Sequence, residues 1–180
     1  MNLRTGKFTL ITLILFGSVG CDQATKLVAR RQLADRETLS YLGDTVRLTL
    51  VENHGAFLGL GATLPGYVRT LLFTGLVGVF LAAFLYWLIR TSTISRLALL
   101  SSSLLVGGGI GNLIDRITFS GGVTDFLNLG IGWLRTGIFN VADVWIMAGA
   151  ALMFVTPEIR EAWRHEDERH TDDPGPLSDP

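Results

Sequence analysis

Four stretches of the chain are apolar and long enough to cross a lipid bilayer as helices. A helix rises about 1.5 Å per residue, so a hydrocarbon core of roughly 30 Å requires about 20 mostly apolar residues. The four stretches run from Phe8 to about Ala29, from Tyr67 to Ile89, from about Leu97 to Ile117, and from about Phe139 to Val155. The pattern therefore predicts an all-α membrane protein with four transmembrane helices.

The segments outside these stretches are of two kinds. Residues 45–51 alternate roughly between apolar and polar side chains, which indicates a short strand outside the membrane. Pro157 ends the last apolar stretch, and the charged residues 158–180 carry too little apolar area to offset the entropy lost on ordering. We expect one membrane domain over residues 1–157 and a disordered cytoplasmic tail over 158–180.

Composition supports a membrane protein and narrows the chemistry. Of the 180 residues, 48% are hydrophobic and 17% are charged, which is less charge than a soluble domain of this size usually carries. The net charge of -1 provides no basic field, so we expect no nucleic-acid partner. The single cysteine excludes an intrachain disulfide, and the histidines lack metal-ligand spacing with it. We expect no metal and no cofactor.

The distribution of basic residues predicts the orientation. Arg4 and Lys7 precede the first helix, and Arg90 and Arg96 lie between the second and third. By the positive-inside rule these segments are cytoplasmic, as are both termini. The opposite side also carries several arginines, so residues 30–66 must form a structured extracytoplasmic element.

Polar residues gather at one end of the predicted bundle. With four helices, the end of the first, the start of the second, the end of the third and the start of the fourth all meet one membrane surface. The polar residues at these positions are Asp22, Gln23, Lys26, Asn112, Asp115, Arg116, Asn140 and Asp143, with Asp125 in the loop before the fourth helix. Ionisable groups at such depths are costly and mark functional sites by default.

Structural interpretations of the same residues stand beside the functional one. Asn140 and Asp143, three residues apart, share an inward helix face, but the same spacing is typical of a capped helix start. Asp22 and Lys26, four residues apart, are spaced as a simple ion pair. Asp125 could be a turn residue.

Two carboxylates are the catalytic groups that remain, because no serine or cysteine can be placed with a histidine in this site. Two aspartates held close cannot both ionise cheaply, so one keeps a proton and the pair can act as base and acid on a water. Asp115 beside Arg116 is more simply an ion pair ending a helix, but spacing does not choose between Asp115 and Asp125. The residues that would orient the dyad and the substrate backbone are Asn112, Arg116 and Asn140.

Five short strings give the chain a resemblance to a known family. They are DQATK at residues 22–26, ENHGA at 52–56, GGGIGNLIDR at 107–116, VTDF at 123–126 and FNVAD at 139–143. In this order, and at these places relative to four helices, they resemble the lipoprotein signal peptidases, or signal peptidase II. The resemblance covers nearly all of the chain except the tail.

The resemblance assigns roles that spacing does not. It implies that Asp125 and Asp143 are the catalytic aspartates, and that residues of about 30–66 form a small β-cradle over the site. The substrate-binding or dyad-orienting residues that it implies are Asp22, Lys26, Asn53, Gly55, Asn112, Arg116 and Asn140. Phe57 and Leu58 depart from the alanine and phenylalanine often found at these positions, so the shape of the substrate loop is not carried over.

The implied activity is that of an aspartic endopeptidase of the bacterial inner membrane, with its active site near the extracytoplasmic face. Its substrate would be a diacylglyceryl-modified prolipoprotein held in membrane lipid and cut before the lipidated cysteine, and the cyclic peptide globomycin would inhibit it. One alternative is a small membrane transporter or scaffold, although a transporter would place its carboxylate near the midplane and show internal repeats. Another is a lipoprotein whose cleaved leader ends before Cys21.

Overall fold

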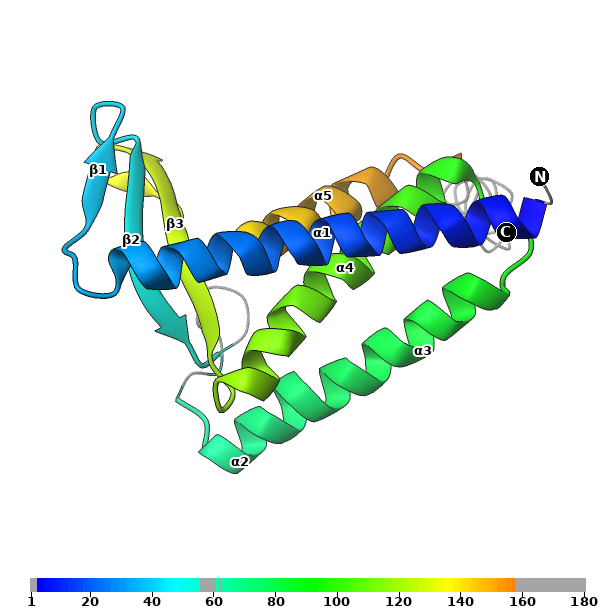
Figure 1. Ribbon diagram of the computed structural model, residues 1–180, viewed down its shortest axis with the longest axis horizontal. Helices are drawn as coiled ribbons and strands as arrows, with labels where there is room; N and C mark the ends of the chain where they lie inside the picture. Colours follow the sequence, from blue (N-terminus) through cyan, green and yellow to red (C-terminus); the bar gives the residue numbers. More distant parts are fainter. Residues whose placement is uncertain (1–2, 56–60, 62, 158–180) are drawn as a thin grey trace, which may run out of the picture.

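The computed structural model describes residues 3–55, 61 and 63–157, and these residues form a helical bundle with a small sheet at one end (Figure 1). The expectations for Phe57, Leu58 and the 158–180 tail lie outside the described residues. Helix α1 covers Leu3–Leu33 and α4 covers Arg96–Thr118. A continuous helix between them consists of α2 (Gly66–Arg69), a π-helical segment η2 (Thr70–Leu76) and α3 (Val77–Arg90).

Three described helices have the length and apolar composition of membrane spans: Thr5–Leu33, Gly66–Arg90 and Arg96–Thr118. The fourth predicted span is helix α5, Val141–Met153, whose 13 residues rise about 20 Å and fall short of a roughly 30 Å core. The prediction of a mostly helical membrane protein is confirmed, and the count of four spans stays a prediction. Helix α1 runs unbroken through Cys21.

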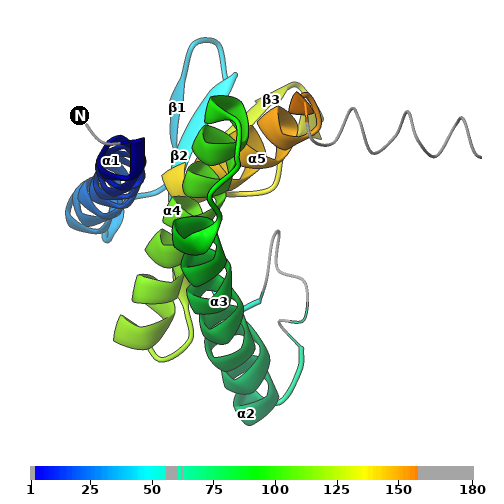
Figure 2. The same ribbon diagram turned by 90° about the vertical axis from the view of Figure 1, so that its right-hand side faces the viewer.

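Helix α4 occupies the centre of the bundle and packs against α1, α3 and α5 (Figures 1 and 2). Two of its glycines allow this close approach. A Cβ atom on Gly108 would lie 2.4 Å from the carbonyl oxygen of Ala142, and one on Gly111 would lie 2.5 Å from Asp22 Oδ2. Small residues are the usual means of bringing membrane helices together, because lipid supplies no hydrophobic drive between them.

The sheet is antiparallel, with its strands in the order β1-β2-β3-β4. The strands are β1 (Leu39–Tyr41), β2 (Val46–Asn53), β3 (Val123–Ile131) and β4 (Leu134–Arg135). The strand expected near residues 45–51 is confirmed as β2. The cradle is larger than the expected 30–66 segment, because β3 and β4 come from the connection between α4 and α5.

Asp125 lies on strand β3, opposite Val51 of β2, so its interpretation as a turn or loop residue was wrong. The sheet is held to the end of α1 by an apolar cluster of Ala29, Leu33 and Phe126. This packing fixes β3 between the last turns of α1 and the first turn of α5.

Candidate active site

Asn140 is the residue on which the site is built. It caps α5: its side-chain oxygen accepts from the backbone N–H of Asp143 at 3.0 Å, and its own N–H donates to Asp143 Oδ2 at 3.1 Å. The capping interpretation of this pair is therefore correct. The same side chain, fully buried, also donates from Nδ2 to Asp125 Oδ1 at 2.7 Å and to Asn112 Oδ1 at 3.1 Å. Asn140 therefore belongs both to the cap of α5 and to the candidate site.

The two candidate catalytic carboxylates thus bind a common residue, and each has a second amide donor. Asn53 Nδ2 donates to Asp125 Oδ2 at 2.9 Å, and Asn112 Nδ2 donates to Asp143 Oδ1 at 2.9 Å. Asp125 is 3% exposed, whereas Asp143 is only partly buried. All four carboxylate oxygens are therefore held in fixed directions by asparagine groups.

The surroundings of Asp125 shift its ionisation. Burial and, to a lesser extent, the nearby charge of Asp143 raise the pKa of this carboxyl, hydrogen bonds from Asn53 and Asn140 lower it, and the net result is a pKa of about 6. A carboxyl with this pKa is available in both protonated and ionised forms near neutral pH. Acid-base catalysis is most efficient with such a group.

A buried charge cluster lies behind the carboxylates. Lys26 is fully buried and lies 2.9 Å from Asp22 Oδ2, 3.4 Å from Asp115 Oδ2 and 2.9 Å from Asn112 Oδ1. The expected pair of Asp22 and Lys26 is confirmed. Asp115 pairs with Lys26 and, at 3.7 Å, with Arg30 of α1. The prediction that Asp115 pairs with its chain neighbour Arg116 was therefore wrong.

The acids of this cluster anchor the elements that carry the two candidate catalytic residues. Asp22 Oδ1 accepts from the backbone N–H of Ala142 in the first turn of α5, and Asp115 Oδ2 accepts from the N–H of Thr124 on β3, both at 2.9 Å. Each anchored residue is the chain neighbour of a candidate catalytic aspartate. The cluster therefore fixes the backbone of Asp125 and of Asp143 against α1 and α4.

Arg116 holds the segment that follows β2. Its guanidinium donates to the carbonyl oxygen of Gly55 at 2.8 Å, and the N–H of Gly55 donates to Asn53 Oδ1 at 2.9 Å. Because Asn53 in turn donates to Asp125, this chain of contacts connects α4 to the candidate dyad from the side opposite α5.

The nine residues that were assigned to the site from the sequence all join one hydrogen-bonded network. Three further members of this network were assigned no role from the sequence. Gln23 donates to Asp22, to Asp115 and to the carbonyl oxygen of Gly111, each at 3.1 Å. Arg30 and Thr124 complete the set. Arg30 could have been found, because it follows Lys26 by four residues on the same helix face. Among the described residues, no three His, Cys, Asp or Glu side chains are grouped as metal ligands.

Comparisons with known proteins agree with this arrangement. The family model described as Signal peptidase (SPase) II matches residues 14–157. The chain is 37% identical to a lipoprotein signal peptidase of Cupriavidus taiwanensis over 158 residues, which cover 88% of this chain and 84% of that one. It is 36% identical to a lipoprotein signal peptidase of Hydrogenovibrio crunogenus, over 95% of this chain and 97% of that one.

A solved structure supports the same assignment. A bacterial membrane enzyme determined by the in meso method at 2.3 Å is similar, with a TM-score of 0.70 and 28% sequence identity, over 82% of this chain and 86% of that one. The family match spans both candidate aspartates and every helix and strand that positions them. The chain therefore belongs to the signal peptidase II family, the lipoprotein signal peptidases.

Proposed function

We propose that Asp125 and Asp143 are the catalytic dyad of an aspartic endopeptidase that removes the signal peptide from a diacylglyceryl-modified prolipoprotein. The observation that carries the proposal is the shared contact with Asn140, which binds one oxygen of each carboxylate. A water between the two acids would attack the peptide bond before the lipidated cysteine. Family membership favours this function over the transporter or scaffold alternative.

The two aspartates take different parts in the proposed reaction. Asp125, with its raised pKa, is the protonated member that donates to the substrate carbonyl oxygen. Asp143, which accepts hydrogen bonds from an amide side chain and from a backbone N–H, takes the proton from the attacking water. When the tetrahedral intermediate collapses, that proton passes to the leaving amine.

Lys26 is proposed as a positioning residue. Its ammonium group can only donate, and it donates to Asn112 Oδ1 at 2.9 Å. The Asn112 amide is thereby fixed with its oxygen toward Lys26 and its Nδ2 toward Asp143. Asp22 and Asp115 compensate the buried cation, so the cluster sets the direction of a donor that touches the base.

Arg116, Gly55 and Asn53 are proposed to shape the other wall of the site. Their contacts hold the segment after β2 beside Asp125, where an extended substrate backbone would pass. The first turn of α5, with Asn140 and Asp143, forms the facing wall.

The place of the dyad suits a lipid-anchored substrate. Asp143 is the third residue of α5, and Asp125 lies on strand β3 of the sheet, which is at one end of the bundle (Figure 1). Each buried methylene of an acyl chain contributes about 0.8 kcal/mol, so the diacylglyceryl group holds the scissile bond close to the membrane surface. We propose that this surface is the extracytoplasmic face of the bacterial inner membrane and that both termini are cytoplasmic, as the arginines around Thr91 suggest.

The proposal is tested with the purified protein in detergent and two synthetic precursor peptides, identical except that one carries a diacylglyceryl group on its cysteine. We expect cleavage before the cysteine of the modified peptide alone, and its inhibition by globomycin. Mass spectrometry of the products locates the cut. Equal cleavage of both peptides would overturn the proposed lipid requirement, and failure to cut either would overturn the function.

A further inference from the structure

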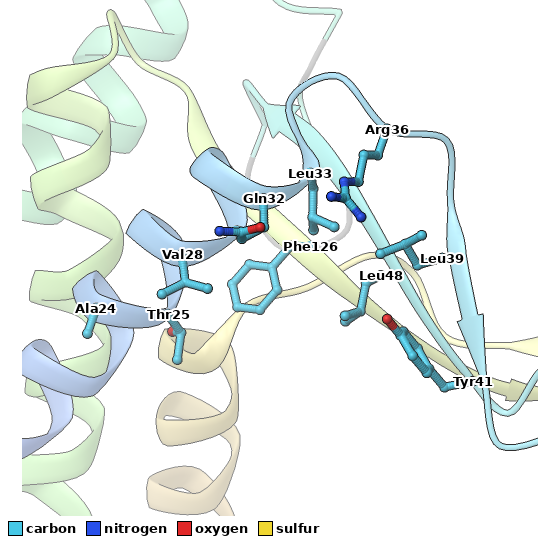
Figure 3. A pocket seen from close by; sticks show the side chains of 11 residues that line it. Ala24, Thr25, Val28, Gln32, Leu33, Arg36, Leu39, Tyr41, Leu48 and Phe126 are labelled. Atoms are coloured by element: carbon cyan, nitrogen blue, oxygen red, sulfur yellow. The ribbon is translucent and has the colours of Figure 1, made fainter.

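A second concave site lies beside the sheet, apart from the residues of the candidate active site. It is a groove of about 470 Å³ between the last turns of α1 and strands β1, β2 and β3 (Figure 3). Phe126 lines it, and since Phe126 directly follows Asp125 on β3, the two side chains leave opposite faces of the strand. None of the residues that line the groove is a member of the hydrogen-bonded network described above, so the groove is a separate site.

The groove is ordered from apolar to polar along α1. Ala24 and Val28 of α1 line one end, and Arg36 and Tyr41 line the other, beyond the last residue of the helix (Figure 3). From Ala24 to Leu33 the helix rises about 14 Å, close to half of a roughly 30 Å hydrocarbon core. The predicted membrane span of α1 ends at about Ala29, so the apolar end of the groove lies at the outer boundary of the hydrocarbon core and its polar end lies beyond that boundary.

The walls are open to lipid along their apolar length. Val28 is 60% exposed although it lies on a helix with the composition of a membrane span. A large apolar surface on such a helix faces acyl chains in a bilayer, and a concave one holds a chain more firmly than a flat one, because more of the chain is in contact.

The polar end carries a cation that is free to bind an anion. In the part of the chain that the structure describes, the guanidinium of Arg36 forms no ion pair. A guanidinium is the side chain best suited to bind phosphate, because its N–H groups match two phosphate oxygens. Asp35 and Glu37 flank Arg36 and offset its charge, which favours a headgroup that carries an amine beside the phosphate.

We propose that this groove binds one zwitterionic glycerophospholipid of the surrounding membrane, with an acyl chain along Val28 and Phe126 and its phosphate at Arg36. The ligand is not the acyl group of the substrate, because that group is attached to the residue next to the scissile bond, and no residue that is hydrogen-bonded to the dyad lines the groove. A bound lipid in this position would brace the sheet against α1, and so support strand β3, which carries Asp125.

Native mass spectrometry of the full chain in detergent, titrated with phosphatidylethanolamine, measures the binding directly. We expect one lipid per chain, bound about tenfold more weakly by Arg36→Gln, since a charge-assisted phosphate contact is lost. Val28→Trp, which fills the apolar end with a bulky ring, should abolish binding. Arg31→Gln is the matched control, because Arg31 is an exposed arginine five residues before Arg36, in the last turn of α1, that does not line the groove. It should bind as the wild type does.

Three results would overturn the proposal. The first is equal lipid binding by all four proteins. The second is one-for-one displacement of the lipid by the diacylglyceryl peptide, which would make the groove a substrate site. The third is a dimer mass that Val28→Trp reduces to a monomer, which would make it an interface between two copies. Cleavage of the lipidated peptide by the same samples is independent of these results and tests the proposed function separately.

Discussion

Replacing Asp125 by asparagine should make the protein more stable at neutral pH while it removes activity. Asparagine resembles the protonated acid in shape and carries no charge. The folded protein favours that neutral form, because burial and the charge of Asp143 raise the pKa of Asp125 from an ordinary 3.8 to about 6. At pH 7.5 most wild-type molecules carry this carboxyl ionised in its buried position at a cost in stability, with the protonated, active form as the minor fraction, and the variant avoids this cost.

The magnitude and its pH dependence follow from linkage. A pKa raised from 3.8 to about 6 corresponds to about 3 kcal/mol at a pH above both values. Because the folded pKa is raised, the contribution of this group to wild-type stability falls as pH rises from 3.8 through 6. Asp125→Asn should therefore gain up to about 3 kcal/mol at pH 7.5, or several degrees in the unfolding midpoint, and lose this gain near pH 4.

Asp44→Asn is the matched control, with the same chemical change and the opposite sign. Hydrogen bonds from Arg47 and Ser40 hold the pKa of the Asp44 carboxyl well below its usual range, so its contribution to stability is present at neutral pH and lost in acid. Its backbone has a φ of 72°, which asparagine tolerates. Thermal unfolding in detergent at pH 7.5 and pH 4 compares the two variants. A loss of stability in Asp125→Asn at pH 7.5 would refute the reasoning.

Three further perturbations test the supporting structure. Lys26→Met leaves two buried aspartates without their cation and should cost about 3–5 kcal/mol, seen as a lower unfolding midpoint, whereas an unchanged midpoint would show that the cluster is not stabilising. Gly108→Ala places a Cβ atom 2.4 Å from Ala142 O and should cost about 1–3 kcal/mol and lower kcat, whereas Gly17→Ala, with nothing within 4 Å, should change neither. Chelation with EDTA should leave the cleavage rate unchanged, since the proposed chemistry needs only carboxylates and water; a loss restored by added metal would contradict it.

The three long helices could be predicted from sequence because length and apolar composition are local properties. Strand β3 could not, since its first four residues are all buried and show none of the alternation that identifies a half-exposed strand. Its pairing with β2 joins residues at least 70 positions apart, which no short pattern records.

The candidate site was predictable only where its contacts join residues that are close together in the chain. The spacing of Asn140 and Asp143 gave both the cap and an inward-facing pair, and both are present because one asparagine has enough hydrogen-bonding groups for the two roles. The partner of Asp115 was not predictable, because the nearest cation in the chain is Arg116 whereas the nearest in space is Lys26, on another helix.

The central claim is that Asp125 and Asp143 act on one water as a unit. Single-turnover cleavage of the diacylglyceryl peptide by Asp125→Asn, by Asp143→Asn and by the double variant tests it most directly. We predict that each single variant loses at least about 10³-fold in rate and that the double variant loses no more than the worse of the two, because groups acting as a unit are not additive. Full activity in either single variant, or losses that multiply in the double variant, would contradict the account.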